Sequence, residues 1–185
     1  ERGSWYPNRG LMPRANYDLR FQYPEWLTLV ATGDRVEETV AAGWKHSRWV
    51  SRVEIPVAGF NLGVYDSRTL RVGGTSLEVY ATQEAEAALE NRHAATQSAG
   101  EFVLRPTQKG SIPIQVIPKA IKPLAPAALL DRVAEVSSDA VQHFEALFGP
   151  FPYLRLAISQ APGHFGQGWP SLVYLPTLSF LPRAA

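Results

Sequence analysis

The sequence contains no cysteine, so neither a disulfide framework nor a thiolate zinc site can form in it. It has no excess of charge either, because 18 basic and 17 acidic residues leave a net charge of +1. This balance gives no reason to expect a nucleic acid or an anionic membrane as partner. No apolar run approaches the roughly 20 residues that a membrane-spanning helix needs, so we expect no membrane span in this chain.

Familiar catalytic patterns are also missing from the sequence. It has no H-E-x-x-H, the motif that places two imidazoles on one face of a helix beside a general base. The four histidines lie in unrelated segments, and no two are three or four positions apart: His46, His93, His143 and His164. No Ser/His/Asp arrangement or phosphate-binding loop stands out. The sequence therefore predicts no metal ligands and no catalytic residues of its own.

The first 82 residues carry repeated strand signals. Residues 17–23 alternate strictly, with apolar side chains at odd positions, which is typical of a strand with one face in solvent. Further short apolar segments follow, separated by glycine, aspartate and proline, at residues 27–31, 36–40, 43–55, 60–65, 70–72 and 76–81. This spacing predicts an antiparallel sandwich or saddle-shaped sheet over residues 1–82.

Residues 83–125 are predicted to link two domains. Five prolines between positions 106 and 126 exclude a continuous helix or a central strand there, although residues 112–117 could add an edge strand. A second domain is expected over residues 126–185. It opens with a helix from Pro126 to Phe148, which ends where Gly149 and Pro150 stop it. The apolar positions of this helix predict one buried face made of Leu129, Val133, Val136, Ala140, Phe144 and Leu147.

Two apolar strands are predicted after the helix, at residues 153–160 and 171–180, with a loop at 161–170 between them. The loop contains three glycines and two prolines. An ordinary connection is the commoner role of such a loop. The alternative is that its glycines let the backbone come close to a ligand or to another segment.

The run FGPFPYLRLAISQAPGHFGQGWPSLVYL, residues 148–175, resembles the alanyl-aminopeptidase family of zinc metallopeptidases, the gluzincins. In that family a helix ending in F-G-x-[FY]-P precedes a strand and a G-x-M-E-[NY]-P loop. The N-terminal half resembles the family's β domain at residues 5–7, 18–24, 29–33, 49–51, 58–65 and 77–81. The resemblance implies an α+β, mainly β fold: an N-terminal antiparallel β domain, then the first helix and strands of an incomplete thermolysin-like domain.

The resemblance also implies a substrate-binding segment. Its residues would be Gln160, Gly166, Gln167, Gly168, Trp169 and Pro170. The strand that follows, residues 171–175, is expected to pair with an extended peptide. The family's glutamate, which binds the free α-amine of the substrate, is replaced here by Gly168, so aminopeptidase specificity is not implied. The zinc-binding helix would follow residue 185, so zinc is implied for a longer parent and not for this chain.

Three hypotheses follow. In the first, the chain is an inactive fragment of a zinc metallopeptidase that hydrolyses peptides. In the second, the parent keeps the peptidase architecture as a peptide-binding, protein-binding or assembly module without catalysis. In the third, residues 1–81 are a free-standing β-sandwich and the later resemblance is accidental. An incomplete sheet also leaves an edge exposed, which predicts a homo-oligomer formed through that edge. Nothing in the sequence indicates a cellular compartment.

Overall fold

A computed structural model describes residues 5–6, 13–85, 89–91, 103–104, 114–115, 124–164 and 166–181. Its central element is a five-stranded sheet in the order β11-β12-β10-β7-β6. The strands are β6 (Asp66–Val72), β7 (Thr75–Ala81), β10 (Arg155–Ala161), β11 (Gln167–Trp169) and β12 (Leu172–Pro176). β10 runs parallel to both β7 and β12, whereas β6 and β11 pair antiparallel with their neighbours.

The described residues also form three smaller sheets. A three-stranded antiparallel sheet has the order β1-β4-β3 and is made of β1 (Asp18–Pro24), β3 (Asp34–Ala41) and β4 (Trp44–Val50). Two further antiparallel pairs join β2 (Thr28–Ala31) with β5 (Phe60–Gly63) and β8 (Val103–Leu104) with β9 (Ile114–Gln115). The short strand β9 lies inside the segment 112–117, where an edge strand was expected.

The predicted helix is present. A 3-10 turn, η1 (Pro126–Leu129), leads into α2 (Leu130–Phe148), and a second 3-10 turn, η2 (Thr177–Phe180), follows β12. The helix ends as expected: Gly149 has a φ of 89°, and its N–H donates to the carbonyl oxygen of Glu145. With one long helix against mostly antiparallel strands, the prediction of an α+β, mainly β fold is confirmed.

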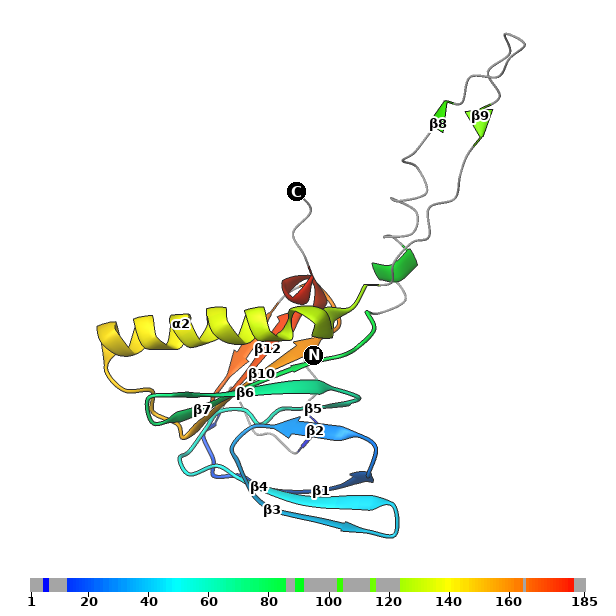
Figure 1. Cartoon of the computed structure of the whole chain (residues 1–185). Coiled ribbons are helices and arrows are strands. Elements are labelled where there is room, and N and C mark those ends of the chain that lie inside the picture. Colours follow the sequence, from blue (N-terminus) through cyan, green and yellow to red (C-terminus); the bar gives the residue numbers. More distant parts are fainter. Residues whose placement is uncertain are drawn as a thin grey trace, which may run out of the picture.

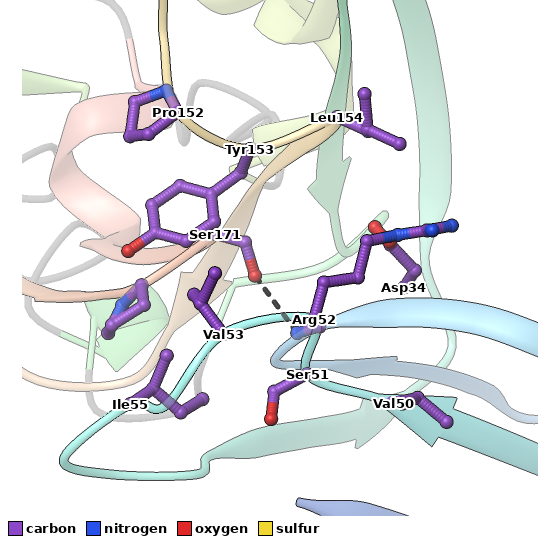
Figure 2. A pocket seen from close by; sticks show the side chains of 12 residues that line it. Asp34, Val50, Ser51, Arg52, Val53, Ile55, Pro152, Tyr153, Leu154 and Ser171 are labelled. Atoms are coloured by element: carbon purple, nitrogen blue, oxygen red, sulfur yellow. Dashed lines mark hydrogen bonds and ion pairs between the residues drawn. The ribbon is translucent and has the colours of Figure 1, made fainter. Parts of the chain in front are cut away.

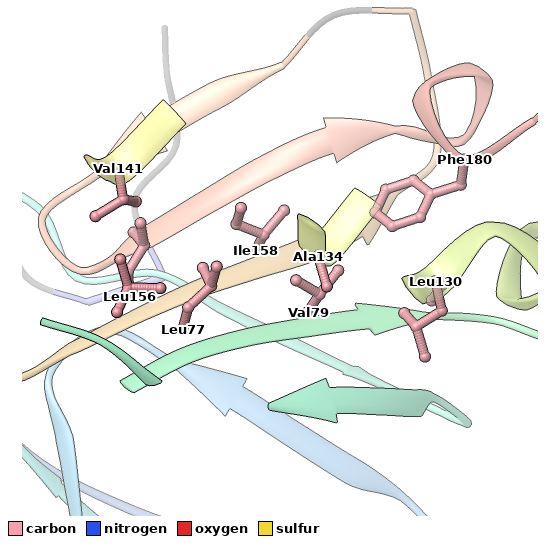
Figure 3. Close-up of a cluster of buried hydrophobic side chains, with 10 residues drawn as sticks. Leu77, Val79, Leu130, Ala134, Val141, Leu156, Ile158 and Phe180 are labelled. Atoms are coloured by element: carbon pink, nitrogen blue, oxygen red, sulfur yellow. The ribbon is translucent and has the colours of Figure 1, made fainter. Parts of the chain in front are cut away.

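The layers follow from burial on both faces of the five-stranded sheet. Figure 1 shows α2 lying across one face, with β1, β3 and β4 beyond the other. Under the helix, side chains from β7 and β10 point toward α2 and η2 (Figure 3), and this cluster includes Leu77, Val79, Leu156, Ile158 and Phe180. A strand buried on both faces carries apolar residues without alternation, as the run Leu156–Ile158 does.

β2 fills the space between the two larger sheets. Its Val30 packs with Ala157 and Leu172 of the five-stranded sheet. Its Leu29 and Ala31 pack instead with the aromatic core of the three-stranded sheet. A strand with apolar residues on both faces can serve two cores at once, which explains why the segment 28–31 is buried almost throughout.

The buried face of α2 differs from the predicted one. Leu130, Ala134 and Val141 are the helix residues that are buried against the sheet. Four members of the predicted stripe are exposed instead: Val136 at 60%, Phe144 at 56%, Leu147 at 61%, and Ala140. The helix carries apolar residues on two faces. A 3.6-residue period of apolar residues in the sequence predicts an apolar face, but it does not identify which of two such faces packs against the sheet.

The predicted boundary at residue 82 falls immediately after β7. That strand pairs along its length with β10, which comes from the other side of the boundary. One sheet therefore joins residues from both predicted domains, and the division into 1–82, 83–125 and 126–185 remains a prediction.

Candidate functional site

The predicted substrate-binding segment contains a strand at the edge of the sheet. β11 pairs antiparallel with β12, with Gln167 opposite Tyr174 and Trp169 opposite Leu172. The segment 161–170 is therefore not entirely a loop. The structure also corrects the expectation that residues 171–175 pair with a peptide, because β12 already has β10 on one side and β11 on the other. Within the sheet, the free edge on this side belongs to β11.

Two glycines of the segment have different physical roles. A Cβ added to Gly166 would lie 2.9 Å from the backbone oxygen of Tyr174, so a larger residue would push β11 away from β12. A Cβ added to Gly168 would meet nothing within 4 Å. Gly168 and its neighbour Gln167 are both exposed. The position that the family fills with glutamate is thus open space in this structure.

Trp169 and Pro170 close the hairpin on its inner side. The Trp169 side chain is half-buried and packs against the cluster of Val30, Ala157 and Leu172. Pro170 begins a two-residue turn in which Ser171 takes the left-handed conformation, with a φ of 61°. Proline presets the first turn position, and the buried contacts of Ser171 hold the second one.

Ser171 fastens this turn to the N-terminal sheets. Its Oγ accepts a hydrogen bond of 2.9 Å from the N–H of Gly33, in the turn between β2 and β3, and its own carbonyl oxygen accepts one from the N–H of Ala157. The Ser171 contact is drawn as a dashed line in Figure 2. A cavity of about 60 Å³ lies beside this turn. Its lining combines apolar side chains such as Val53 and Ile55 with polar residues that include Arg52 and Tyr153.

The side chain of Gln160 lies in the interior, away from the hairpin edge. It is 4% exposed, and its Oε1 accepts hydrogen bonds from the backbone N–H and the hydroxyl of Thr82. Its Nε2 donates to Thr177 Oγ1 at 3.0 Å. Gln160 therefore ties the ends of β7 and β10 to η2, and its polar atoms have partners within the protein.

Sequence reasoning missed the polar junction between the two larger sheets. Arg155 is 7% exposed, and its Nε donates to Glu78 Oε2 at 2.7 Å. Its Nη1 reaches the carbonyl oxygens of Ala31 and Gly33 at 3.0 and 3.3 Å. Its guanidinium lies 4.9 Å from the centre of the Trp49 ring. The available signal was one arginine within the apolar run YLRLAIS.

Glu78 is also bonded to Tyr80, whose hydroxyl donates to Oε2 at 2.7 Å. Burial, followed by the nearby Glu78 carboxylate, raises the pKa of Tyr80 to about 12. Burial also raises the pKa of Tyr174, which packs beside Trp169 in the same layer. Burial therefore disfavours the charged phenolate form of both side chains.

The described residues contain no group of three or more histidines, cysteines, aspartates or glutamates arranged to hold a metal ion. His46 lies in β4, His143 in α2 and His164 between β10 and β11, whereas His93 is outside the described part of the chain. None of the helices in the described ranges is long and apolar enough to cross a membrane.

Solved structures of M1 zinc metallopeptidases share this fold. A two-domain M1 zinc metallopeptidase, in a mutant form bound to L-arginine, matches with a TM-score of 0.55 and 14% identity over 90% of this chain and 31% of its own. The M1 zinc metallopeptidase from Deinococcus radiodurans matches with a TM-score of 0.54 and 15% identity, over 90% of this chain and 31% of its own. A mutant of the Deinococcus protein bound to a Tyr-Ser-Ala substrate matches with a TM-score of 0.53 and 15% identity, over 91% of this chain and 32% of its own.

No family model and no curated protein matches the sequence. The chain spans about a third of the length of the peptidases that share its fold. At 14–15% identity the likeness establishes the fold alone. The residues of the hairpin edge must therefore be judged by their own geometry.

Proposed function

We propose that this chain is the β-rich portion of a zinc metallopeptidase-like protein and that an extended peptide pairs with the free edge of β11. The observation that carries the proposal is the exposed backbone at Gln167 and Gly168, on the edge strand of a sheet in a fold that M1 peptidases share. An edge strand offers unpaired N–H and C=O groups to a peptide, and the absence of a side chain at Gly168 leaves room above the strand.

Hydrolysis would depend on groups outside this portion of the protein. The described residues do not provide the three nitrogen, oxygen or sulfur ligands that a catalytic zinc requires. We therefore propose that zinc is held elsewhere in the parent and that this chain alone is inactive. Zinc content and hydrolysis of aminoacyl-arylamides, measured on this chain and on the full-length protein, test this. Stoichiometric zinc in the chain alone would contradict it.

The peptide site is tested by titrating the chain with an extended pentapeptide while following tryptophan fluorescence, since Trp169 adjoins the edge. A control peptide of the same sequence, N-methylated at alternate residues, cannot form the backbone hydrogen bonds of an added strand. We expect binding of the first peptide and not of the second. Equal binding of both peptides would show that the edge of β11 is not the site.

Gly168→Glu gives a sharper test, because the larger side chain enters open space. The carboxylate should strengthen binding of a peptide with a free α-amine by about tenfold, as expected for one charge-assisted hydrogen bond. Binding of the N-acetylated peptide should not change. Gly168→Gln is the matched control, since it has nearly the same size and no charge. Tighter peptide binding by both variants would show that the larger side chain adds contact area, and not that the carboxylate recognises the α-amine.

A second function is favoured by Gly168 itself. The residue offers no charge to an ammonium group, which suits a peptide-binding, protein-binding or assembly module that has lost catalysis. The two proposals differ in the sequence that follows in the full-length parent. An H-E-x-x-H helix with activity on peptides supports the enzyme, whereas peptide binding by a full-length protein without that motif supports the module.

A further inference from the structure

A cavity of about 190 Å³ lies where the two larger sheets meet. The three-stranded sheet supplies Asp34, Arg35 and Trp49 to its lining, and the five-stranded sheet supplies Glu78, Tyr80 and Arg155. None of these residues belongs to β11 or β12, so the cavity is separate from the proposed peptide edge. This volume is well above the roughly 10–15 Å³ that a single water molecule needs, so the cavity has room for a small organic ligand.

Arg155 brings an unused donor to this junction. A guanidinium carries five N–H groups. The Nε group is bonded to Glu78, and Nη1 is bonded to two backbone carbonyl oxygens. Nη2 has no hydrogen-bond partner among the described residues, and in a side chain that is only 8% exposed it is itself closed to solvent. A ligand can reach it only when a neighbouring side chain moves. A buried donor without an acceptor costs free energy, so a ligand that supplies one would bind favourably.

A second cation lies at the same ring. The guanidinium of Arg35 is 5.9 Å from the centre of the Trp49 ring, and that of Arg155 is 4.9 Å from it. Arg35 is 48% exposed, so its side chain can move to admit or cover a ligand. The indole N–H of Trp49 is already bonded to Ser47 and does not compete for an acceptor.

The two acids of the lining already have partners. Glu78 is paired with Arg155 and Tyr80, and Asp34 is paired with Arg52. Their negative charges are therefore largely compensated. The Nη1 group of Arg35 is likewise paired with Glu38, whereas the Nη2 group of Arg155 retains two N–H groups without an acceptor. A carboxylate can place one oxygen on Nη2 of Arg155 and the other on the Arg35 guanidinium, which a single spherical ion such as chloride cannot do.

We propose that this cavity binds a small carboxylate, whose oxygens accept hydrogen bonds from Nη2 of Arg155 and from the guanidinium of Arg35. The ligand would bridge the two sheets and so stabilise the junction between them. An acid with three to five carbon, nitrogen and oxygen atoms is of the right size for the cavity. The site is independent of the peptide edge and of any metal.

The test is thermal unfolding of the chain in increasing acetate or propionate, with chloride added to keep the ionic strength constant. We expect a melting temperature that rises and saturates. In Arg35→Gln the apparent Kd should rise about tenfold, as expected for the loss of one charge-assisted hydrogen bond. Arg48→Gln is the matched control, because it removes a positive charge of the same sheet whose partners, Asp18 and Glu37, do not line this cavity, and its Kd should be unchanged.

A general salt effect would raise the melting temperature without saturation and by the same amount in the unmodified chain and in both variants. That outcome would overturn the proposal. A direct readout is the NMR signals of the Arg155 guanidinium in the unmodified chain. Acetate should shift these signals with the same Kd as in thermal unfolding. Unshifted Arg155 signals at an acetate concentration that saturates the melting temperature would also overturn it.

Discussion

Replacement of Arg155 by methionine should destabilise the chain more than any loss of a surface ion pair. Methionine keeps much of the length and apolar stem of arginine but removes every donor. The Glu78 carboxylate, only 20% exposed, would lose its ionic partner. The carbonyl oxygens of Ala31 and Gly33 would lose their hydrogen-bond donor, and the Trp49 ring would lose the nearer of its two cations.

The expected loss can be estimated from these contacts. Removal of one partner from a buried ion pair costs about 3–5 kcal/mol, chiefly because the remaining charge is left uncompensated. The total stability of a domain is about 5–15 kcal/mol, so the variant would lose between about a fifth of it and all of it. With an m value of about 2 kcal/mol/M, the midpoint of urea unfolding should fall by about 2 M.

The assay is urea unfolding of Arg155→Met, Glu78→Gln and the double variant. Because the two side chains form one network, the double variant should lose less stability than the sum of the single losses. Arg48→Met is the control, since Arg48 bonds to Asp18 and Glu37 at the exposed face of the other sheet and should shift the midpoint far less. A loss below about 1 kcal/mol for Arg155→Met, or strict additivity, would refute the assignment of a buried pair.

Three further predictions concern the hairpin, alkaline pH and the helix. Gly166→Ala should lower the midpoint of urea unfolding and speed amide hydrogen exchange in β12, whereas Gly168→Ala should change neither. Equal effects of the two variants would contradict the close approach of Gly166 to the backbone oxygen of Tyr174. The pKa of Tyr80 is raised from 10.0 to about 12 in the folded chain, so its contribution to stability is complete below pH 10 and is lost as pH rises toward 12. In urea unfolding, the free energy of unfolding of Tyr80→Phe should fall less steeply between pH 10 and pH 12 than that of the unmodified chain. The same pH dependence in both proteins would be evidence against a raised pKa of Tyr80. The exposed apolar face of α2, where the Phe144 and Phe148 rings stack 6.2 Å apart, together with the free sheet edges, predicts self-association of the chain. Sedimentation should show more monomer for Phe144→Lys than for the control Asp139→Lys, and a monomeric unmodified chain would exclude the prediction.

Much of the secondary structure was predictable because it depends on neighbouring residues. Strict alternation over residues 17–23 predicted β1, and the interval between Pro126 and Gly149 predicted α2 with its end. The three-residue strand β11 was missed because a glycine lies at its centre and three residues show no period. A strand this short forms because it can pair with β12, and this pairing depends on the neighbouring strand and not on the residues of β11 alone.

The arrangement of the elements was less predictable. The pairing of β7 with β10 joins residues nearly 80 positions apart, and no local pattern encodes it. The same is true of the bond between Ser171 and Gly33, with a separation of 138 positions. Arg155 was not singled out from the sequence, and although a lone arginine in an apolar run needs a partner when it is buried, no local pattern identifies that partner as Glu78.

The candidate site shows the same division between local and long-range information. Gln160 and Trp169 were selected by their place in a motif, yet their surroundings differ: Gln160 lies in a buried network, and Trp169 lies at the inner side of an edge strand. Gly168 combines an exposed backbone with empty space above it. A glutamate would fit there without strain, so packing does not explain its absence. Either the ligand of this edge presents no free amine, or an acid from another part of the parent meets it, and the Gly168→Glu titration distinguishes these alternatives.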